Sequence, residues 1–227
     1  MAHFHIPKPL HGWREFAGEV GIIVLGVLIA LAAEQVVEDL QWHHKVAVVR
    51  KSLMGELAND RARWELDVAT ARCDLGVINR LDAWAQAGSP GGSKAITGSL
   101  GGSEMFWMHA ANWNLATSSQ SLDRFPMQEQ LAFGALYDAI AHRQIALEKA
   151  SDLIGRVETL VPLSGDAGRR SELQSVIGSL RWVINSLLEN EDYMKRHFDA
   201  VGVTPDRSDI AADISRLGKP LRGCRES

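Results

Sequence analysis

One apolar run near the N-terminus constrains the fold of this 227-residue chain more than any other feature. Residues 20–33 are fourteen consecutive uncharged residues bounded by Glu19 and Glu34. As a helix they cover only ~21 Å of a ~30 Å hydrocarbon core. The wider segment 16–37 has 22 residues, interrupted only by Glu19, Glu34 and Gln35, and as a helix it is about 33 Å long. Because the two carboxylates lie near its ends, where headgroup water is within reach, the sequence predicts a transmembrane helix over residues 16–37.

The residues that flank this segment agree with a membrane span and give it a direction. Trp13 and Trp42 lie 29 residues apart, about 43 Å of helix, which matches a bilayer with its headgroups. Lys8 and Arg14 precede the span, whereas acidic residues follow it directly, and cytoplasmic flanks carry the excess of Lys and Arg. We therefore expect residues 1–15 to be a short cytoplasmic tail and the rest of the chain to lie in the periplasm of a bacterial inner membrane.

Two other interpretations of the apolar run stay open from the sequence alone. Ala30-Leu31-Ala32 has the small-x-small form of a signal-peptide cleavage site, with cleavage after Ala32. Glu15 and Glu19 make a poor positively charged leader, which favours an uncleaved anchor. A buried helix of a soluble protein is the third interpretation, and the acidic ends and paired tryptophans disfavour it.

One face of the predicted anchor is built for close packing. At 100° per residue, Glu19, Gly26, Ala30 and Ala33 fall within about 60° of one another. Small residues four apart let helix backbones approach closely, and a carboxyl group can hydrogen-bond across such a contact. This pattern predicts self-association or docking against another membrane helix, although Gly and Ala also occur in anchors that do not pair.

Beyond the membrane the pattern is helical throughout. Apolar residues recur at three- and four-residue steps over residues 34–87, with a break or kink expected near Gly55 or Gly76. Residues 88–103 hold six Gly and four Ser and predict a flexible loop. A short helix within residues 104–121 comes next. Phe125-Pro126 then opens a helix with Pro126 in its first turn, which stops at Pro162, and another helix follows the candidate N-cap Asp166.

The last of these helices has the most regular repeat. Its apolar positions alternate four and three steps over residues 173–201, as in a heptad seam, and Gly202 and Pro205 end it. The predicted fold is all-α: one N-terminal transmembrane helix continuing into an antiparallel bundle of three to four long helices. The bundle would occupy residues 38–201 and a polar tail residues 202–227.

The sequence lacks the residue patterns that catalysis, metal binding and phosphate binding require. With 24 Lys and Arg against 28 Asp and Glu, and no long basic run, the chain is not expected to bind nucleic acid. It has no Glu-x-x-His, His-Glu-x-x-His or Cys-x-x-Cys metal spacing, no phosphate-binding loop and no Gly-x-Ser-x-Gly nucleophile elbow. We expect no catalytic residue, no metal and no cofactor.

Two smaller features leave alternatives open. Phe106, Trp107 and Trp113, beside Met105 and Met108, can line a ligand pocket or partner patch, but such clusters more often fill the space between packed helices. The two cysteines, Cys73 and Cys224, can form one disulfide in an oxidising compartment or remain free.

The N-terminal part resembles a known kind of protein. Residues 19–31 read Glu-Val-Gly-Ile-Ile-Val-Leu-Gly-Val-Leu-Ile-Ala-Leu, followed by Ala33-Glu-Gln-Val-Val-Glu38 and Trp42-His-His44. A short basic tail, this anchor and a Gln- or Glu-rich juxtamembrane helix resemble a group of uncharacterised proteobacterial single-pass inner-membrane proteins. The resemblance covers residues 10–60, with a weaker echo over 126–140. It implies a proteobacterial source and carries over no activity, because the group has none assigned.

These features predict a non-enzymatic role. We expect a membrane-anchored helical bundle that acts as a scaffold or accessory subunit of a membrane complex. Its partners would be the lipid bilayer and either further copies of itself or another membrane protein. The alternative is a periplasmic sensor-like bundle that binds a small ligand near Trp107 and Trp113.

Overall fold

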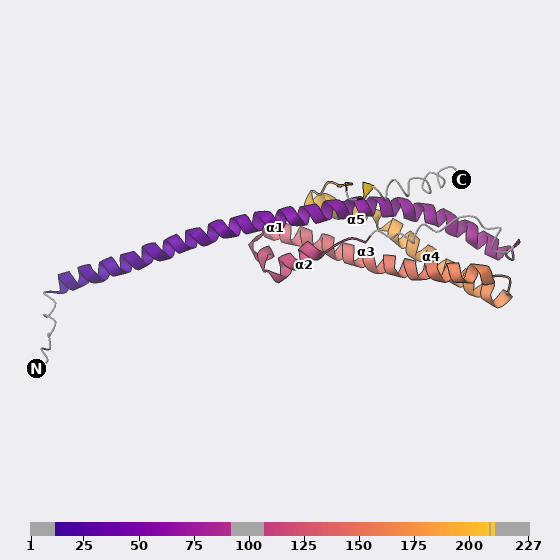
Figure 1. The fold of residues 1–227 in the computed structure, drawn as a ribbon, viewed down its shortest axis with the longest axis horizontal. Helices are drawn as coiled ribbons and strands as arrows, with labels where there is room; N and C mark the ends of the chain where they lie inside the picture. The colour runs from indigo at the N-terminus through magenta and orange to yellow at the C-terminus, as the bar shows by residue number, and fades with distance from the viewer. Residues whose placement is uncertain (1–11, 92–106, 209, 212–227) are drawn as a thin grey trace, which may run out of the picture. The chain divides into compact units, whose positions relative to one another are not determined.

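The computed structural model describes residues 12–91, 107–208 and 210–211. Every regular element in these ranges is helical, so the all-α prediction is confirmed for the described chain. The α-helices are α1 (Trp13–Gln86), α2 (Ala111–Ser118), α3 (Met127–Leu160), α4 (Ala167–Glu189) and α5 (Glu191–Val201). Two short 3-10 helices, η3 (Ser121–Arg124) and η4 (Val161–Leu163), lead into and out of α3 (Figure 1).

The chain divides between Val48 and Val49 into an N-terminal unit and a folded unit, which are described separately. In the N-terminal unit, the start of α1 is long and apolar enough to cross a membrane. None of the residues in its most apolar stretch is buried. Within its own unit the run at 20–33 is therefore exposed.

The main hydrophobic core of the folded unit comes from three helices. Its buried residues lie on α1 between Ala71 and Ala85, on α3 between Leu147 and Leu160, and on α4 between Leu173 and Leu187. Leu173, Ile177 and Leu180 have no exposed surface at all. Since these positions follow the three- and four-residue apolar spacing of the sequence, the core faces of α3 and α4 are the faces that the periodicity predicted.

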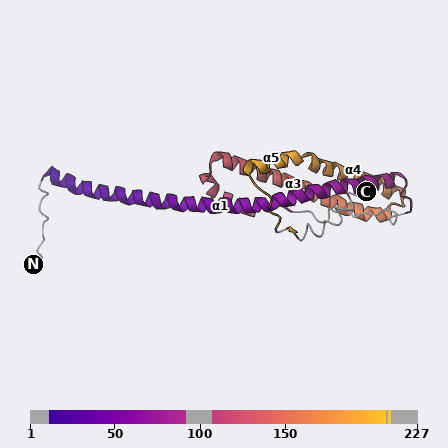
Figure 2. The same cartoon turned by 90° about the horizontal axis from the view of Figure 1, so that it is seen from above.

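Helices α3 and α4 form a hairpin, and both views show them side by side (Figures 1 and 2). The α3 helix ends at Leu160, just before Pro162, which cannot continue an α-helix. Asp166 then caps α4, because its side-chain oxygen accepts a hydrogen bond from the backbone N–H of Arg169 at 2.9 Å. Both boundaries agree with the sequence prediction.

A second region of packing joins α1, α3 and α5. The Trp64 ring of α1 lies 5.6 Å from that of Phe198 on α5. The Arg50 guanidinium of α1 lies 5.0 Å from the ring of Phe125, which in turn meets Phe133 of α3 edge to face at 6.1 Å. Gly202 ends α5 in the left-handed conformation, with φ of 76°, where a residue without a Cβ is favoured. Gly202 was predicted as this helix end.

The continuous heptad expected over residues 173–201 is interrupted at Asn190. This residue ends α4 and begins α5, and its side-chain amide donates to the Ser186 carbonyl at 2.8 Å. An Asn side chain that bonds the nearby backbone competes with the regular helical pattern, which explains the break. Met194 and Phe198 are still buried, so the apolar seam continues in a new helix.

A break or kink was expected near Gly55 or Gly76, and α1 continues as one helix through both positions. A glycine inside a helix costs only about 1 kcal/mol relative to alanine. Leu53 and Leu57 flank Gly55 and have no exposed surface. Their burial offsets that cost.

Candidate functional site

The predicted packing face of the anchor is exposed along its whole length. Glu19, Gly26, Ala30 and Ala33 all lie on solvent-facing positions of α1 in the N-terminal unit. A Cβ placed on Gly26 would meet no described atom within 4 Å. Within its unit, the face is therefore open to a neighbouring helix.

The two predicted interfacial tryptophans have different surroundings. Trp13 is 79% exposed and its ring lies 6.0 Å from Phe16. The Trp42 indole N–H donates to a carboxylate oxygen of Glu38 at 3.3 Å, and the Lys45 ammonium lies 4.5 Å from the centre of the Trp42 ring. An acid, an aromatic ring and a base thus lie at successive turns of this part of α1.

The predicted aromatic patch is only partly present as one surface. Phe106 lies outside the described residues, and Trp107 is 50% exposed. The Trp113 ring stacks on Tyr137, with centroids 4.7 Å apart and planes at 15°. Trp113 is therefore engaged in packing between α2 and α3, as in the core-filling interpretation.

Two carboxylates of α1 hold α2 in place, and the sequence did not identify them. Glu56 accepts a hydrogen bond from the backbone N–H of Asn112 at 2.9 Å and another from the Tyr137 hydroxyl at 2.7 Å. Asp60 accepts the backbone N–H of His109 with both of its oxygens, at 2.9 and 3.0 Å. The N-cap residue of α2 is Ala110, whose side chain cannot cap. Glu56 supplies the missing acceptor from another helix.

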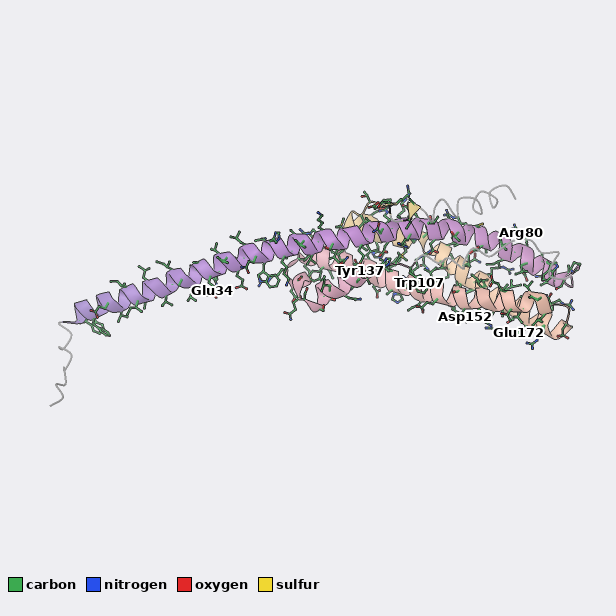
Figure 3. All side chains as sticks on the ribbon, viewed as in Figure 1. Glu34, Arg80, Trp107, Tyr137, Asp152 and Glu172 are labelled. Carbon is green, nitrogen blue, oxygen red and sulfur yellow. The ribbon has the colours of Figure 1, made fainter. Side chains whose placement is uncertain are left out.

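Burial changes the acidity of two groups in this cluster. Asp60 has no exposed surface, and burial raises its pKa to about 6, although the hydrogen bonds and charge of His109 act in the opposite direction. Burial and the neighbouring Glu56 carboxylate raise the pKa of the Tyr137 hydroxyl. Tyr137 points from α3 toward α1 (Figure 3) and therefore stays a hydrogen-bond donor to Glu56.

A second polar contact lies within the helical core. The Arg143 guanidinium of α3 donates to Asp67 of α1 at 2.8 Å and to the Leu187 carbonyl of α4 at 3.2 Å. Both charged side chains are almost fully buried. Burial raises the pKa of Asp67, while the charge of Arg143 and its hydrogen bond oppose that change. This pair connects three helices at a single height.

These acids have a common sequence signal. Asp60, Asp67 and Asp74 are spaced by seven residues on α1, and all three are buried. Acidic residues spaced by seven on the apolar face of a helix are expected to have hydrogen-bond or ion-pair partners on neighbouring helices. The sequence alone shows this spacing.

The remaining sequence expectations concern metals and cysteines. Within the described ranges, no group of three or more His, Cys, Asp or Glu side chains is arranged to hold a metal ion. Cys73 is disulfide-bonded. The other cysteine of the sequence, Cys224, lies outside the described residues.

Comparison with known proteins adds no homologue. No protein family, curated protein or solved structure matches the sequence. The resemblance noted for residues 10–60 therefore stays a prediction.

Proposed function

We propose that this chain is a single-pass inner-membrane protein whose helical bundle, on the periplasmic side, serves as a scaffold or accessory subunit of a membrane complex. The observation that carries the proposal is the start of α1, which is long and apolar enough to span a bilayer and has no buried residue in its most apolar stretch. An exposed apolar helix of this size is unfavourable in water, since every large apolar side chain left in water costs about 1.5–3 kcal/mol. Lipid removes that cost.

The polar residues along α1 are compatible with this assignment. Glu19 and Glu34 are ~22 Å apart along the helix, so each would lie a few ångströms inside a ~30 Å core and within reach of headgroup water. The Glu38, Trp42 and Lys45 contacts fit the boundary region, where an indole has its ring in lipid and its N–H near water.

Two independent features favour the periplasm for the folded unit. Lys8 and Arg14 lie on the N-terminal side of the span, as expected for a cytoplasmic N-terminus. Cys73 of the folded unit is disulfide-bonded, and disulfides persist in oxidising compartments such as the periplasm.

The hydrogen bonds that the carboxylates of α1 accept support the scaffold role. Glu56 and Asp67 accept hydrogen bonds from residues of other helices, and Asp60 accepts the backbone N–H of His109 in the segment that leads into α2. Groups engaged in this way stabilise a rigid shape, which is what an assembly subunit needs. The small-residue face at Gly26, Ala30 and Ala33 offers a contact for a second membrane helix.

Two measurements test the proposal. Alkaline phosphatase fused after Ser227 should be active and β-galactosidase at the same position inactive, because only the phosphatase folds productively in the periplasm. The reverse pattern would contradict the orientation. Crosslinking mass spectrometry in native membranes should recover the folded unit bound to itself or to another membrane protein, and recovery of the uncrosslinked chain alone would contradict the scaffold role.

A sensor-like bundle that binds a small ligand near Trp107 and Trp113 is the second candidate. The half-exposed Trp107 favours it, but the stacking of Trp113 on Tyr137 leaves that ring less free for a ligand. A metabolite screen that shifts both tryptophan fluorescence and the melting temperature would support it, whereas no shift for any compound would eliminate it.

A further inference from the structure

The seam between α3 and α4 on the side away from α1 is lined differently from the rest of the folded unit. Arg181 of α4 reaches α1, where its guanidinium bonds Asp82 and Asn79. Trp182 lies about 100° further round the helix and meets α3 instead, with the Lys149 ammonium 5.3 Å from its ring centre. Asp152 lies on the same side of α3, away from α1 (Figure 3). We call this face of the α3–α4 hairpin, which carries Lys149, Asp152 and Trp182, the outer seam.

Two hollows lie along the outer seam, one on each side of Trp182 and Lys149. The first has a volume of about 430 Å³ and is lined by Ala139, His142 and Ala146 of α3, by Ser186 of α4 and by Tyr193 and Met194 of α5, among others. The second, of about 520 Å³, is lined by Asp152, Gly155 and Thr159 of α3, by Leu163 of the connecting turn and by Arg169 and Glu172 of α4, among others. The outer seam therefore presents two hollows with the exposed Trp182 ring between them.

Two large apolar side chains beside these hollows are left largely exposed by the described part of the chain. Trp182 and Ile145 are each 66% exposed. Ile145 lies one helical turn from Lys149, so it belongs to the same patch as the Trp182 ring. Aromatic residues beside a pocket are the usual centres of protein–protein interfaces. Tyr193, 44% exposed, adds a second aromatic ring at the edge of the first hollow.

We propose that the outer seam is the contact through which two copies of this chain associate, with the Trp182 ring of each copy packed into the hollows of the other. Because the projecting ring and the holes are on one face, that face is complementary to itself, as a twofold interface requires. Charges of both signs flank it. Arg169 already pairs with Glu172 at 3.0 Å within one copy, whereas the exposed Asp152 and Lys149 are opposite charges that two identical faces can pair with each other.

The size of the seam also suits a dimer. The 23 residues of α4 make a helix about 35 Å long, and two helices side by side are ~20 Å wide. The face thus offers roughly 700 Å² per copy and ~1,400 Å² in the pair, within the usual range of about 1,200–2,000 Å² for specific interfaces. This inference identifies a second copy of the chain as the partner of the proposed scaffold. It rests on the proposed function, because anchoring both copies in one membrane raises their effective concentration.

The test is the mass of the full chain in mild detergent, measured by chromatography with light scattering over a range of concentrations. The wild type should be a dimer. Trp182→Glu should weaken association by at least roughly thirtyfold, because the loss of an interface centre costs that much or more. Leu115→Glu is the matched control, since Leu115 is also exposed, at 64%, but lies on α2. Circular dichroism should show all variants equally helical.

Two further variants complete the design. Gly26→Leu blocks the anchor face and leaves the seam intact. A dimer lost in Trp182→Glu but kept in Leu115→Glu supports the proposal, with or without an effect of Gly26→Leu. A monomeric wild type, or a dimer lost in Gly26→Leu and kept in Trp182→Glu, overturns it. A benzophenone amino acid in place of Trp182 should crosslink to a second copy of the chain, and adducts with other proteins alone would overturn the choice of partner. Failure of the membrane assignment itself would appear separately, as release of the chain from membranes.

Discussion

Asp60 gives the folded unit a pH-dependent stability of definite sign. Its pKa is raised by burial from 3.8 to about 6 in the folded state, whereas in the unfolded chain it returns to its ordinary value. A carboxyl group with a raised folded-state pKa favours folding when it is protonated. Its contribution is complete below pH 3.8 and is lost as the pH rises through about 6. The free energy of unfolding should therefore increase as the pH falls from neutral toward 5.

The size of the effect follows from the same two pKa values. A shift of about two pKa units corresponds to ~3 kcal/mol in full, at 1.36 kcal/mol per unit. Between pH 7.5 and pH 5 only part of the titration takes place, which gives roughly 1–2 kcal/mol from Asp60. Asp67, whose pKa is also raised by burial, acts in the same direction.

Urea unfolding of the full chain in mild detergent, followed by circular dichroism at several pH values, measures this dependence. The comparison that isolates Asp60 is Asp60→Asn, which removes the charge and keeps one acceptor oxygen for the His109 N–H. The rise in stability from pH 7.5 to pH 5 should be roughly 1–2 kcal/mol smaller in this variant than in the wild type. Asp123→Asn, at an exposed position of η3, is the control variant and should show the wild-type dependence of stability on pH. Parallel curves for wild type and Asp60→Asn would refute the reasoning.

Three further variants test the core and the compartment. Arg143→Met should lower the free energy of unfolding by about 3–5 kcal/mol, because Asp67 is left buried without its partner, and adding Asp67→Leu should recover much of the loss; equal stability of the single and double variants would contradict this. Leu180→Ala, at a position with no exposed surface, should cost about 2–5 kcal/mol in urea unfolding, and a loss below about 0.5 kcal/mol, typical of a surface site, would contradict its core position. In protein isolated without reductant and then denatured, a thiol reagent should label Cys73 only after reduction, and labelling before reduction would contradict both its disulfide and the periplasmic assignment.

The sequence predicted well those features that depend on local spacing. The Asp166 cap, the stop before Pro162 and the Gly202 helix end each follow from one residue type at one position. The buried faces of α3 and α4 follow from apolar periodicity over several turns. Such signals need no knowledge of what a helix packs against.

The candidate site was hidden because its contacts are long-range. Glu56 and Tyr137 are 81 residues apart in sequence, and Asp67 and Arg143 are 76 apart. No residue near Asp60 in the sequence indicates that the backbone N–H of His109, 49 residues away, donates a hydrogen bond to its buried carboxylate. The seven-residue spacing of the acids marks these positions as unusual, but only the packing of α1 against α2 and α3 identifies their partners.

Two local predictions about helix continuity differ from the structure. A break or kink was expected near Gly55 or Gly76, and α1 continues through both positions, with Leu53 and Leu57 beside Gly55 fully buried. Asn190 was expected to lie inside a helix and instead ends one, because its amide bonds the Ser186 carbonyl. The Asn190 contact is polar, and the apolar repeat does not encode it.

The most direct test of the account is extraction of isolated cell membranes with alkaline carbonate. This treatment strips peripheral and soluble proteins and leaves lipid-embedded helices behind. If residues 16–37 span the bilayer, the full-length chain should remain in the membrane pellet and enter solution only with detergent. Recovery of the intact chain in the carbonate supernatant would contradict the membrane assignment and, with it, the proposed role.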